Sequence, residues 1–111
     1  MHTCVDEFLP DCKQLIKERK VDLFLNDADN KSTVNMLGYS VLNVLQELSE
    51  LTADDLFDGP VPDKNSKYPG DVFIFKKSVQ GHLLYIKLKI REAKGRKEVF
   101  MMSFHPDRPQ T

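Results

Sequence analysis

Residues 84–91 read LYIKLKIR, and their strict alternation of apolar and polar side chains decides the fold class. Successive side chains of a β-strand point to opposite faces, so one face is aliphatic and the other carries a phenol followed by three cations. The aliphatic face holds Leu84, Ile86, Leu88 and Ile90, and the opposite face holds Tyr85, Lys87, Lys89 and Arg91. The pattern predicts a strand in a sheet that is covered on one side only.

A second strand is predicted at residues 99–105, which read VFMMSFH, after a short turn near Lys94-Gly95-Arg96. Regular alternation assigns one face of this strand to the apolar row and the other face to the polar row. The expected apolar members are Phe100, Met102 and Phe104, and the expected members of the other face are Val99, Met101, Ser103 and His105. Pairing of the two strands then brings Tyr85, Lys87, Ser103 and His105 onto one face.

The N-terminal half of the chain is predicted to be mainly helical. Apolar residues at helical spacing indicate a helix within residues 1–20, which either begins at Pro10 or kinks there. Residues 21–25 alternate as a short strand, and residues 26–31 form a polar turn. The next expected helices run from Ser32 to Leu37 and from Ser40 to Leu48, with one further turn after Thr52.

The C-terminal half of the chain is predicted to consist mainly of strands. Residues 58–70 are rich in glycine and proline and are expected to form a loop, and residues 71–105 supply three strands joined by turns such as Gln80-Gly81. Residues 106–111 are expected to trail as a tail. The order predicts a single α+β domain over residues 1–111, an antiparallel sheet packed on one side by N-terminal helices.

The composition narrows the class of protein. A chain of 111 residues with 41% hydrophobic residues has the size of one domain. No stretch approaches the about 18 apolar residues of a membrane span, and no signal pattern opens the chain, so we expect a cytoplasmic protein. Cys4 and Cys12 would lie about 12 Å apart along one helix and are expected to be reduced thiols. No metal site and no cofactor are predicted.

The charge is strongly polarised along the chain. Residues 1–60 carry 12 acidic and 5 basic side chains, a net charge of −7, whereas residues 61–111 carry 5 acidic and 11 basic side chains, a net charge of +6. Such asymmetry can place a basic working face opposite an acidic shell. The plain alternative is a mixed, solvated surface. The row of cations on one strand face favours the functional interpretation.

Several short runs follow one another in an informative order and spacing. The runs are Leu51-Thr52-Ala53-Asp54-Asp55, Asp58-Gly59-Pro60-Val61-Pro62-Asp63, Pro69-Gly70-Asp71-Val72-Phe73-Ile74-Phe75, Gly81, Tyr85-Ile86-Lys87-Leu88-Lys89 and Ser103-Phe104-His105. Together they resemble one branch of the MqsR-like toxins over roughly residues 37–105. The resemblance implies a RelE-like α+β fold and a bacterial type II toxin that cleaves mRNA without a metal. It also implies a cognate antitoxin protein from the same operon.

The resemblance also assigns site residues. The family's catalytic tyrosine lies in a Tyr-x-Lys strand, which matches Tyr85 and Lys87. Its C-terminal catalytic lysine follows a Ser-Phe pair, and His105 holds that position here. A further family lysine and a family glutamine fall near Asp58 and Gly70, where their side chains are lost. The predicted catalytic residues are therefore Tyr85, Lys87 and His105.

Metal-independent RNA cleavage needs a base for the 2′-OH, an acid for the leaving 5′-oxygen and cations for the phosphorane charge. His105 is the candidate base or acid because imidazole titrates near neutral pH; the plain alternative is an exposed histidine at a strand end. Tyr85 is expected to orient the 2′-OH or to stack a base, and its plain alternative is packing on the sheet surface. Lys87 is expected to hold the phosphate. The predicted RNA-binding residues are Lys64, Lys67, Lys89, Arg91 and Ser103, for whose cations a solvated surface is the plain alternative.

Two functions from different classes remain open from the sequence. The first is a toxin endoribonuclease with mRNA as substrate, an antitoxin as partner and a monomeric free form. The second is a catalytically impaired RNA- or protein-binding module on the same fold, since a fold does not by itself carry a function. A regulator unrelated to RNA ranks third.

Overall fold

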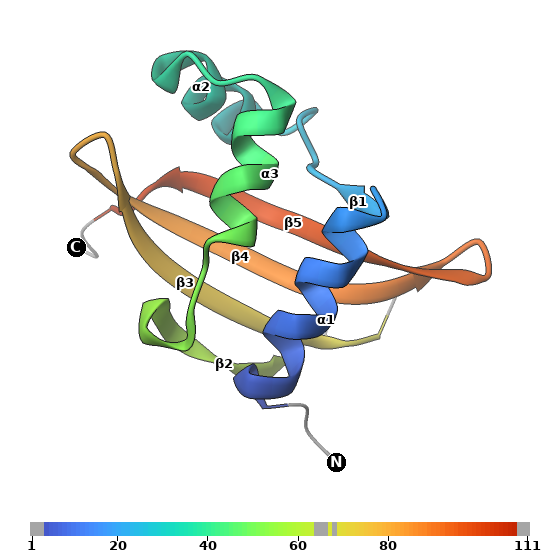
Figure 1. Ribbon diagram of the computed structural model, residues 1–111. Helices are drawn as coiled ribbons and strands as arrows, with labels where there is room; N and C mark the ends of the chain where they lie inside the picture. The colour runs from blue at the N-terminus through green and yellow to red at the C-terminus, as the bar shows by residue number, and fades with distance from the viewer. Residues whose placement is uncertain (1–3, 64–66, 68, 109–111) are drawn as a thin grey trace.

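The computed structural model describes residues 4–63, 67 and 69–108. Within these residues, the chain forms a five-stranded mixed sheet and three α-helices (Figure 1). The elements are α1 (Val5–Lys17), β1 (Val21–Asp22), α2 (Ala28–Leu37), α3 (Val41–Ser49), a 3-10 turn η1 (Ala53–Asp55), β2 (Leu56–Pro62), β3 (Asp71–Val79), β4 (His82–Ala93) and β5 (Arg96–Pro106). The strand order is β1-β5-β4-β3-β2, so β4 is central. The predicted α+β class is confirmed.

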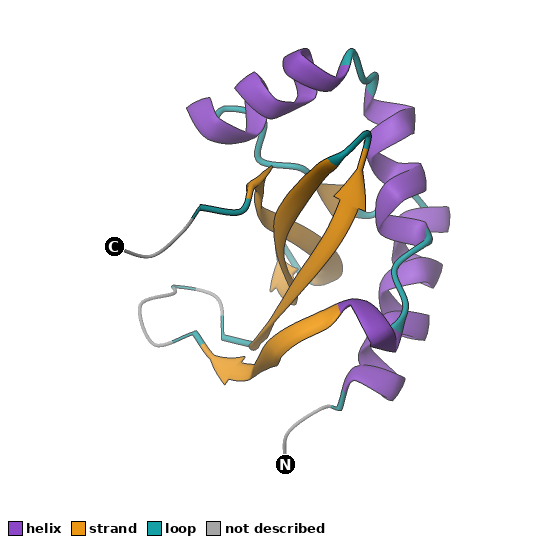
Figure 2. Ribbon diagram, turned by 90° about the vertical axis from the view of Figure 1, so that its left-hand side faces the viewer, coloured by secondary structure: helices purple, strands orange, loops and turns teal. Residues whose placement is uncertain are grey.

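The helices are distributed unevenly around the sheet. α1 and α3 lie across one face, and α2 lies at the β5 edge (Figure 1). In the side view of Figure 2, no described helix covers the opposite face, which we call the open face. Among the described residues, none of the helices combines the length and the apolar character needed to cross a bilayer.

The predicted start of α3 is confirmed, whereas the predicted end of α1 is not. The Ser40 hydroxyl accepts a hydrogen bond from the backbone N–H of Asn43, and the Asn43 side chain accepts one from the N–H of Ser40. This reciprocal cap starts α3 at the predicted place. α1 ends at Lys17 rather than at residue 20, and it contains Pro10 beyond its first turn, so the helix does not begin at that proline.

The start of α2 was predicted wrongly. The helix begins at Ala28, because the Asp27 carboxylate accepts a hydrogen bond from the backbone N–H of Asn30 at 3.1 Å. Residues 28–31 therefore belong to the helix, only the first two residues of the predicted 26–31 turn lie outside it, and Ser32 lies inside the helix instead of capping it. The predicted end is correct, since Gly38 closes the helix in the left-handed conformation.

Both edges of the sheet differ from the prediction. β1 is shorter than residues 21–25 and runs parallel to β5, with Val21 opposite Val99, so the sheet is mixed rather than wholly antiparallel. The long connection through the helices permits this parallel pairing. At the other edge, β2 occupies the first part of the predicted 58–70 loop. Its prolines are tolerated because an edge strand needs fewer backbone donors.

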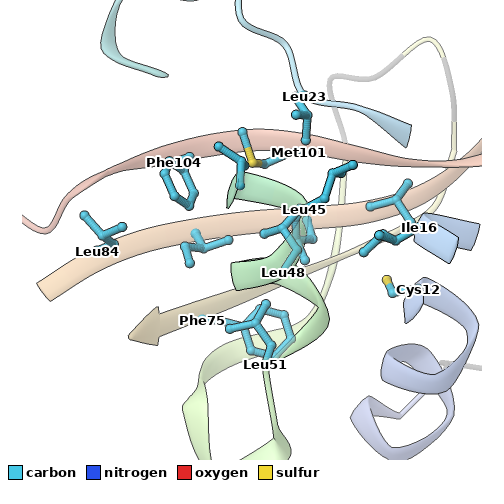
Figure 3. Packing of buried hydrophobic residues seen from close by; sticks show 14 of the residues in the cluster. Cys12, Ile16, Leu23, Leu45, Leu48, Leu51, Phe75, Leu84, Met101 and Phe104 are labelled. Atoms are coloured by element: carbon cyan, nitrogen blue, oxygen red, sulfur yellow. The ribbon is translucent and has the colours of Figure 1, made fainter. Parts of the chain in front are cut away.

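The core lies between the sheet and the helices (Figure 3). Leu84, Ile86 and Leu88 of β4 are at most 1% exposed, so the predicted aliphatic face is confirmed. They form one buried cluster with α3 side chains and with residues from α1, β3 and β5, among them Val44, Leu45, Leu48, Cys12, Ile16, Phe73 and Phe75. Cys4 and Cys12 are both free thiols, and burial raises the pKa of Cys12, so this thiol stays protonated.

The predicted alternation of β5 was wrong at four positions, residues 99–102. Val99 and Met101 are fully buried, whereas Phe100 and Met102 are only partly buried and do not belong to the core cluster. The reason is a β-bulge: Leu88 pairs with Met101 and Lys87 pairs with Ser103, so Met102 is one extra residue in β5. The bulge reverses the alternation, and it leaves Phe104 buried as predicted.

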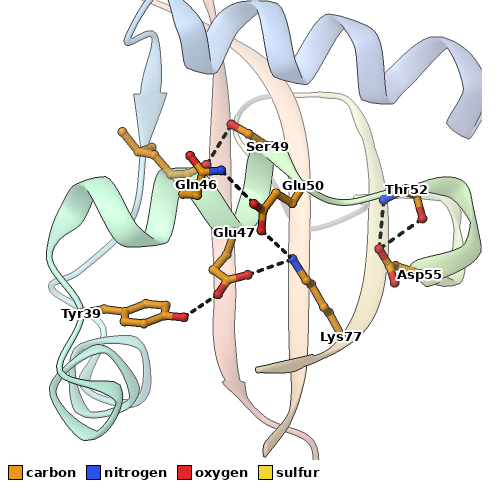
Figure 4. A network of polar contacts seen from close by, with 9 residues as sticks. Tyr39, Gln46, Glu47, Ser49, Glu50, Thr52, Asp55 and Lys77 are labelled. Carbon is orange, nitrogen blue, oxygen red and sulfur yellow. Dashed lines mark hydrogen bonds and ion pairs between the residues drawn. The ribbon is translucent and has the colours of Figure 1, made fainter. Parts of the chain in front are cut away.

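A polar network fastens α3 to β3 at the helix-covered face (Figure 4). Lys77 Nζ lies 2.8 Å from Glu47 Oε1 and 3.5 Å from Glu50 Oε1, and the Tyr39 hydroxyl donates a hydrogen bond to Glu47. This hydrogen bond is the main cause that raises the pKa of Tyr39. Lys77 thus links β3 to α3, whereas the neighbouring Lys76 belongs to the open face.

Candidate functional site

Tyr85 and His105 lie side by side on the open face. They are direct cross-strand partners in β4 and β5, and their rings stack with centroids 5.2 Å apart and planes 13° apart. The next pair along the two strands is Lys87 and Ser103. All four side chains are partly buried. The structure therefore brings the three predicted catalytic residues together and adds one predicted RNA-binding residue beside them.

The imidazole of His105 is oriented by the end of its own strand. Its Nδ1 lies 2.9 Å from the carbonyl oxygen of Pro106. A carbonyl oxygen only accepts hydrogen bonds, so Nδ1 is the nitrogen that carries the proton. In the neutral ring, Nε2 then keeps its lone pair. A nitrogen in this state can take a proton, which is what a general base requires.

The Tyr85 phenol is held in its protonated form. Partial burial is the largest cause that raises the pKa of Tyr85, and the nearby Asp58 carboxylate raises it further. Lys76 lowers this pKa and Asp107 raises it, and the net direction is upward. At neutral pH the hydroxyl can therefore donate a hydrogen bond or a proton, and it does not act as a base.

Lys76 is a further polar group of the open face that the sequence interpretation missed. It is the β3 partner of Tyr85, and its Nζ lies 3.0 Å from Asp107 Oδ2 and 3.7 Å from the centroid of the Phe57 ring. Both side chains of the ion pair are 25% exposed. A phosphate that competes with the Asp107 carboxylate can therefore reach this ammonium group from solvent.

Lys87 lies next to the Tyr85–His105 pair and has no acidic partner in the described part of the chain. Its cross-strand neighbours are Ile74 on β3 and Ser103 on β5, and both are uncharged. The ammonium group is thus not neutralised by these neighbours. Of the cations predicted along β4, Lys87 is the one best placed to bind a phosphate at the centre of the site.

Lys89 does not extend a surface row of cations as predicted. Its side chain is 1% exposed, and its Nζ lies 3.0 Å from Asp63 Oδ2. Its cross-strand neighbours Val72 and Phe100 belong to the same face, and Val72 is also buried. The predicted surface position of Lys89 was therefore wrong, and its predicted role in RNA binding is not supported, because the side chain is covered and its charge is paired.

Arg91 is also engaged within the fold. Its guanidinium group lies 3.8 Å from the centroid of the Phe100 ring, 2.9 Å from Asp22 Oδ2 and 3.7 Å from Glu98 Oε1. Its side chain is only 14% exposed. These contacts tie β4 to β1 and β5, so the predicted role of Arg91 as a free phosphate contact is not supported.

Replacing Lys89 with alanine should lower stability and leave RNA affinity unchanged. Removal of Lys89 leaves the Asp63 carboxylate without its partner in a partly buried ion pair. This should lower the free energy of unfolding by about 1–3 kcal/mol. Urea denaturation and an RNA-binding titration measure the two effects separately. A large loss of affinity at unchanged stability would instead return Lys89 to the RNA-contacting set.

Of the two lysines predicted to bind RNA from the 58–70 loop, only Lys67 lies within the described residues. Lys67 is exposed and can contact a ligand from the segment before β3. Lys64 lies outside the described residues.

Two positions depart from the family pattern in ways that the structure explains. Asp58, where the resemblance places a lysine, lies in β2 and close enough to Tyr85 to raise its pKa. Gly70, where it places a glutamine, has φ +155°, and a Cβ atom there would lie 2.7 Å from the Ile90 carbonyl oxygen. The close approach excludes a side chain, so Gly70 cannot supply a polar group to the site.

The residues that the structure describes include no group of three or more His, Cys, Asp and Glu side chains arranged to hold a metal ion. No protein-family model matches the sequence, and neither a curated protein nor a solved structure matches it.

Proposed function

We propose that this chain is the toxin of a bacterial toxin–antitoxin pair, an endoribonuclease that cleaves mRNA at the open face. The observation that carries the proposal is the stacked Tyr85–His105 pair with the cation of Lys87 beside it, which has no acidic partner among the described residues. A proton acceptor, a proton donor and a phosphate-binding cation thus lie on one face. The resemblance to MqsR-like toxins supports the same activity and a RelE-like classification of the fold.

The proposed reaction uses the 2′-OH of the RNA as its nucleophile. His105 Nε2 takes the proton of the 2′-OH, the 2′-oxygen forms a bond to phosphorus, and the bond from phosphorus to the 5′-oxygen breaks. Tyr85 gives its proton to the leaving 5′-oxygen, and Lys87 offsets the charge that develops on the phosphorane. The products are a 2′,3′-cyclic phosphate and a 5′-hydroxyl. No cofactor takes part.

The partners follow from the same proposal. The substrate places the protein in the cytoplasm, where the free toxin acts as a monomer. A cognate antitoxin from the same operon holds it inactive by covering Tyr85 and His105 or by blocking the approach to them. The charged groups around this pair, among them Lys76 and Asp107, offer contacts to such a partner.

One observation favours the alternative of a non-catalytic RNA- or protein-binding module. Asp58 and Asp107 place negative charge near Tyr85, and this weakens the attraction of a phosphate to the site. The two functions predict different results with purified protein and a single-stranded RNA labelled at its 5′ end. The endoribonuclease gives a product ending in a 2′,3′-cyclic phosphate, also in the presence of a chelator. The binding module gives a complex without cleavage at any protein concentration.

RNA binding should depend only moderately on salt. With Lys87 and Lys76 as the main phosphate contacts, log Kobs should fall against log salt with a slope of about −1.4, at about −0.7 per contact. Filter binding between low and physiological salt measures this slope. Lys76→Ala should reduce it by about 0.7, whereas the matched change Lys77→Ala should leave it unchanged, because Lys77 lies in the network on the other face. A salt-independent affinity would contradict the proposed contacts.

A further inference from the structure

The outward position of His105 depends on the β5 bulge. Met101 points into the core, and two residues later a regular strand would again point inward, at Ser103. The extra residue Met102 shifts the alternation, so Phe104 is buried and Ser103 and His105 reach the open face. Without a bulge, a strand of this sequence that keeps Met101 in the core would also point His105 into the core, where it could not stack on Tyr85.

A buried side chain of α2 holds this bulge from the side. Asn30 is 0% exposed, its Oδ1 accepts a hydrogen bond from the backbone N–H of Phe104 at 2.8 Å, and its Nδ2 donates to the carbonyl oxygen of Met102 at 3.4 Å. The same Nδ2 lies 3.3 Å from the carbonyl oxygen of Phe24. The Asn30 amide therefore contacts β5 on both sides of Ser103.

The place of these hydrogen bonds explains why an amide is needed. β1 pairs with β5 only at Val99 and Phe100, so no described strand covers the β5 edge at Met102 and Phe104. Buried backbone groups without partners would destabilise the bulged conformation. One carboxamide offers a donor and an acceptor as a peptide group does, and Asn30 thus takes the place of a neighbouring strand at this point.

We propose that Asn30 is a positioning residue of the site: it holds the β5 bulge and thereby keeps His105 stacked on Tyr85. The part of this inference that concerns RNA cleavage rests on the proposed function, whereas the part that concerns ring geometry does not. Asn30 lies on another element and touches neither ring in the hydrogen bonds described. Its effect on catalysis passes through the backbone of β5.

The test compares Asn30→Leu, which removes both hydrogen bonds and keeps the branched shape of the side chain with larger methyl groups, with Asn30→Asp, which keeps the acceptor for Phe104. Asn30→Leu should abolish the NOE between the Tyr85 and His105 rings and increase hydrogen exchange at the Phe104 amide. Asn30→Asp should keep part of both signals, and it remains informative if the leucine variant does not fold. Val34→Ala, a buried change in the same helix, and Asn35→Ala, an exposed one, should keep the ring NOE.

Cleavage kinetics test the link to the proposed function. Asn30→Leu should lower kcat by about 10²-fold with little change in KM, the effect of misplacing a reacting group by about 1 Å. If wild-type protein does not cleave RNA but Asn30→Leu loses the ring NOE, the positioning role stands and the proposed function fails. Asn30→Leu with the ring NOE and the protection of the Phe104 amide both intact would overturn the positioning role.

Deletion of the extra residue gives a second, independent test. A chain without Met102 has a regular β5 in which Phe104 still points inward and His105 outward, because the bulge is no longer needed. In that background, Asn30→Leu should keep the NOE between Tyr85 and His105. Loss of the NOE there as well would show that Asn30 acts by another route than the bulge.

Discussion

Replacing His105 with alanine should lower the rate of RNA cleavage by about 10²–10⁴-fold, the usual contribution of a general acid or base. The expectation rests on the Nδ1 hydrogen bond to Pro106, which leaves Nε2 as the proton acceptor, and on the stacking of the ring against Tyr85. Single-turnover cleavage of a short single-stranded RNA measures the effect. Growth arrest on induced expression should disappear in parallel.

Companion variants separate the roles within the site. Tyr85→Phe keeps the ring stack and loses the hydroxyl, so it should lose less activity than Tyr85→Ala. Lys87→Ala should weaken both turnover and RNA binding. His82→Ala is the matched control, because this exposed histidine begins β4 at the turn from β3 and alternates with the buried Leu84 and Ile86 rather than with Tyr85. Full activity of the His105→Ala, Tyr85→Ala double variant would refute the site even if the protein proved to be a ribonuclease.

Local sequence information was sufficient for the faces of β4 and for the turn between β3 and β4. The alternation in residues 84–91 correctly separated the buried aliphatic side chains from Tyr85 and Lys87. The turn at Gln80-Gly81 also fixes the register of β3 and β4, with Val79 opposite His82. Counting from this turn places Lys76 opposite Tyr85, so the missed lysine was within reach of the sequence.

The bulge and its support could not be predicted from local patterns. A bulge shifts the alternation by one residue and leaves no mark in a run of apolar residues such as Phe100, Met101 and Met102. Asn30 reads as an ordinary polar residue of a turn, and its partners lie more than seventy residues away in the sequence. The geometry of the site is thus determined by a contact between distant segments, although its residue types were visible in the sequence.

In the folded protein, the acidic and basic halves of the chain partly neutralise each other. Acidic residues of the first half pair with basic residues of the second half, as Asp22 does with Arg91 and Glu47 with Lys77. Folding therefore neutralises much of the net charge of +6 that residues 61–111 carry. Near Tyr85 the cations that remain are few, Lys76 and Lys87, whereas the exposed cations Lys94, Arg96 and Lys97 lie at the β4–β5 turn at the other end of the hairpin. This arrangement favours local recognition of one phosphate over long-range attraction of RNA.

The adjacent residues Met101 and Met102 provide the sharpest test of the strand faces. Met101→Ala should reduce the free energy of unfolding by about 2–5 kcal/mol, because it removes a fully buried side chain from the core. Met102→Ala should reduce it by no more than about 1 kcal/mol, since this side chain is only partly buried. The two changes are chemically identical and occur at neighbouring positions, so urea-induced unfolding compares burial alone. Regular alternation from Phe104 would bury Met102 and expose Met101, and it predicts the opposite order. A larger loss for Met102→Ala would therefore contradict the bulge, and with it the proposal that Asn30 positions His105 by holding the bulge.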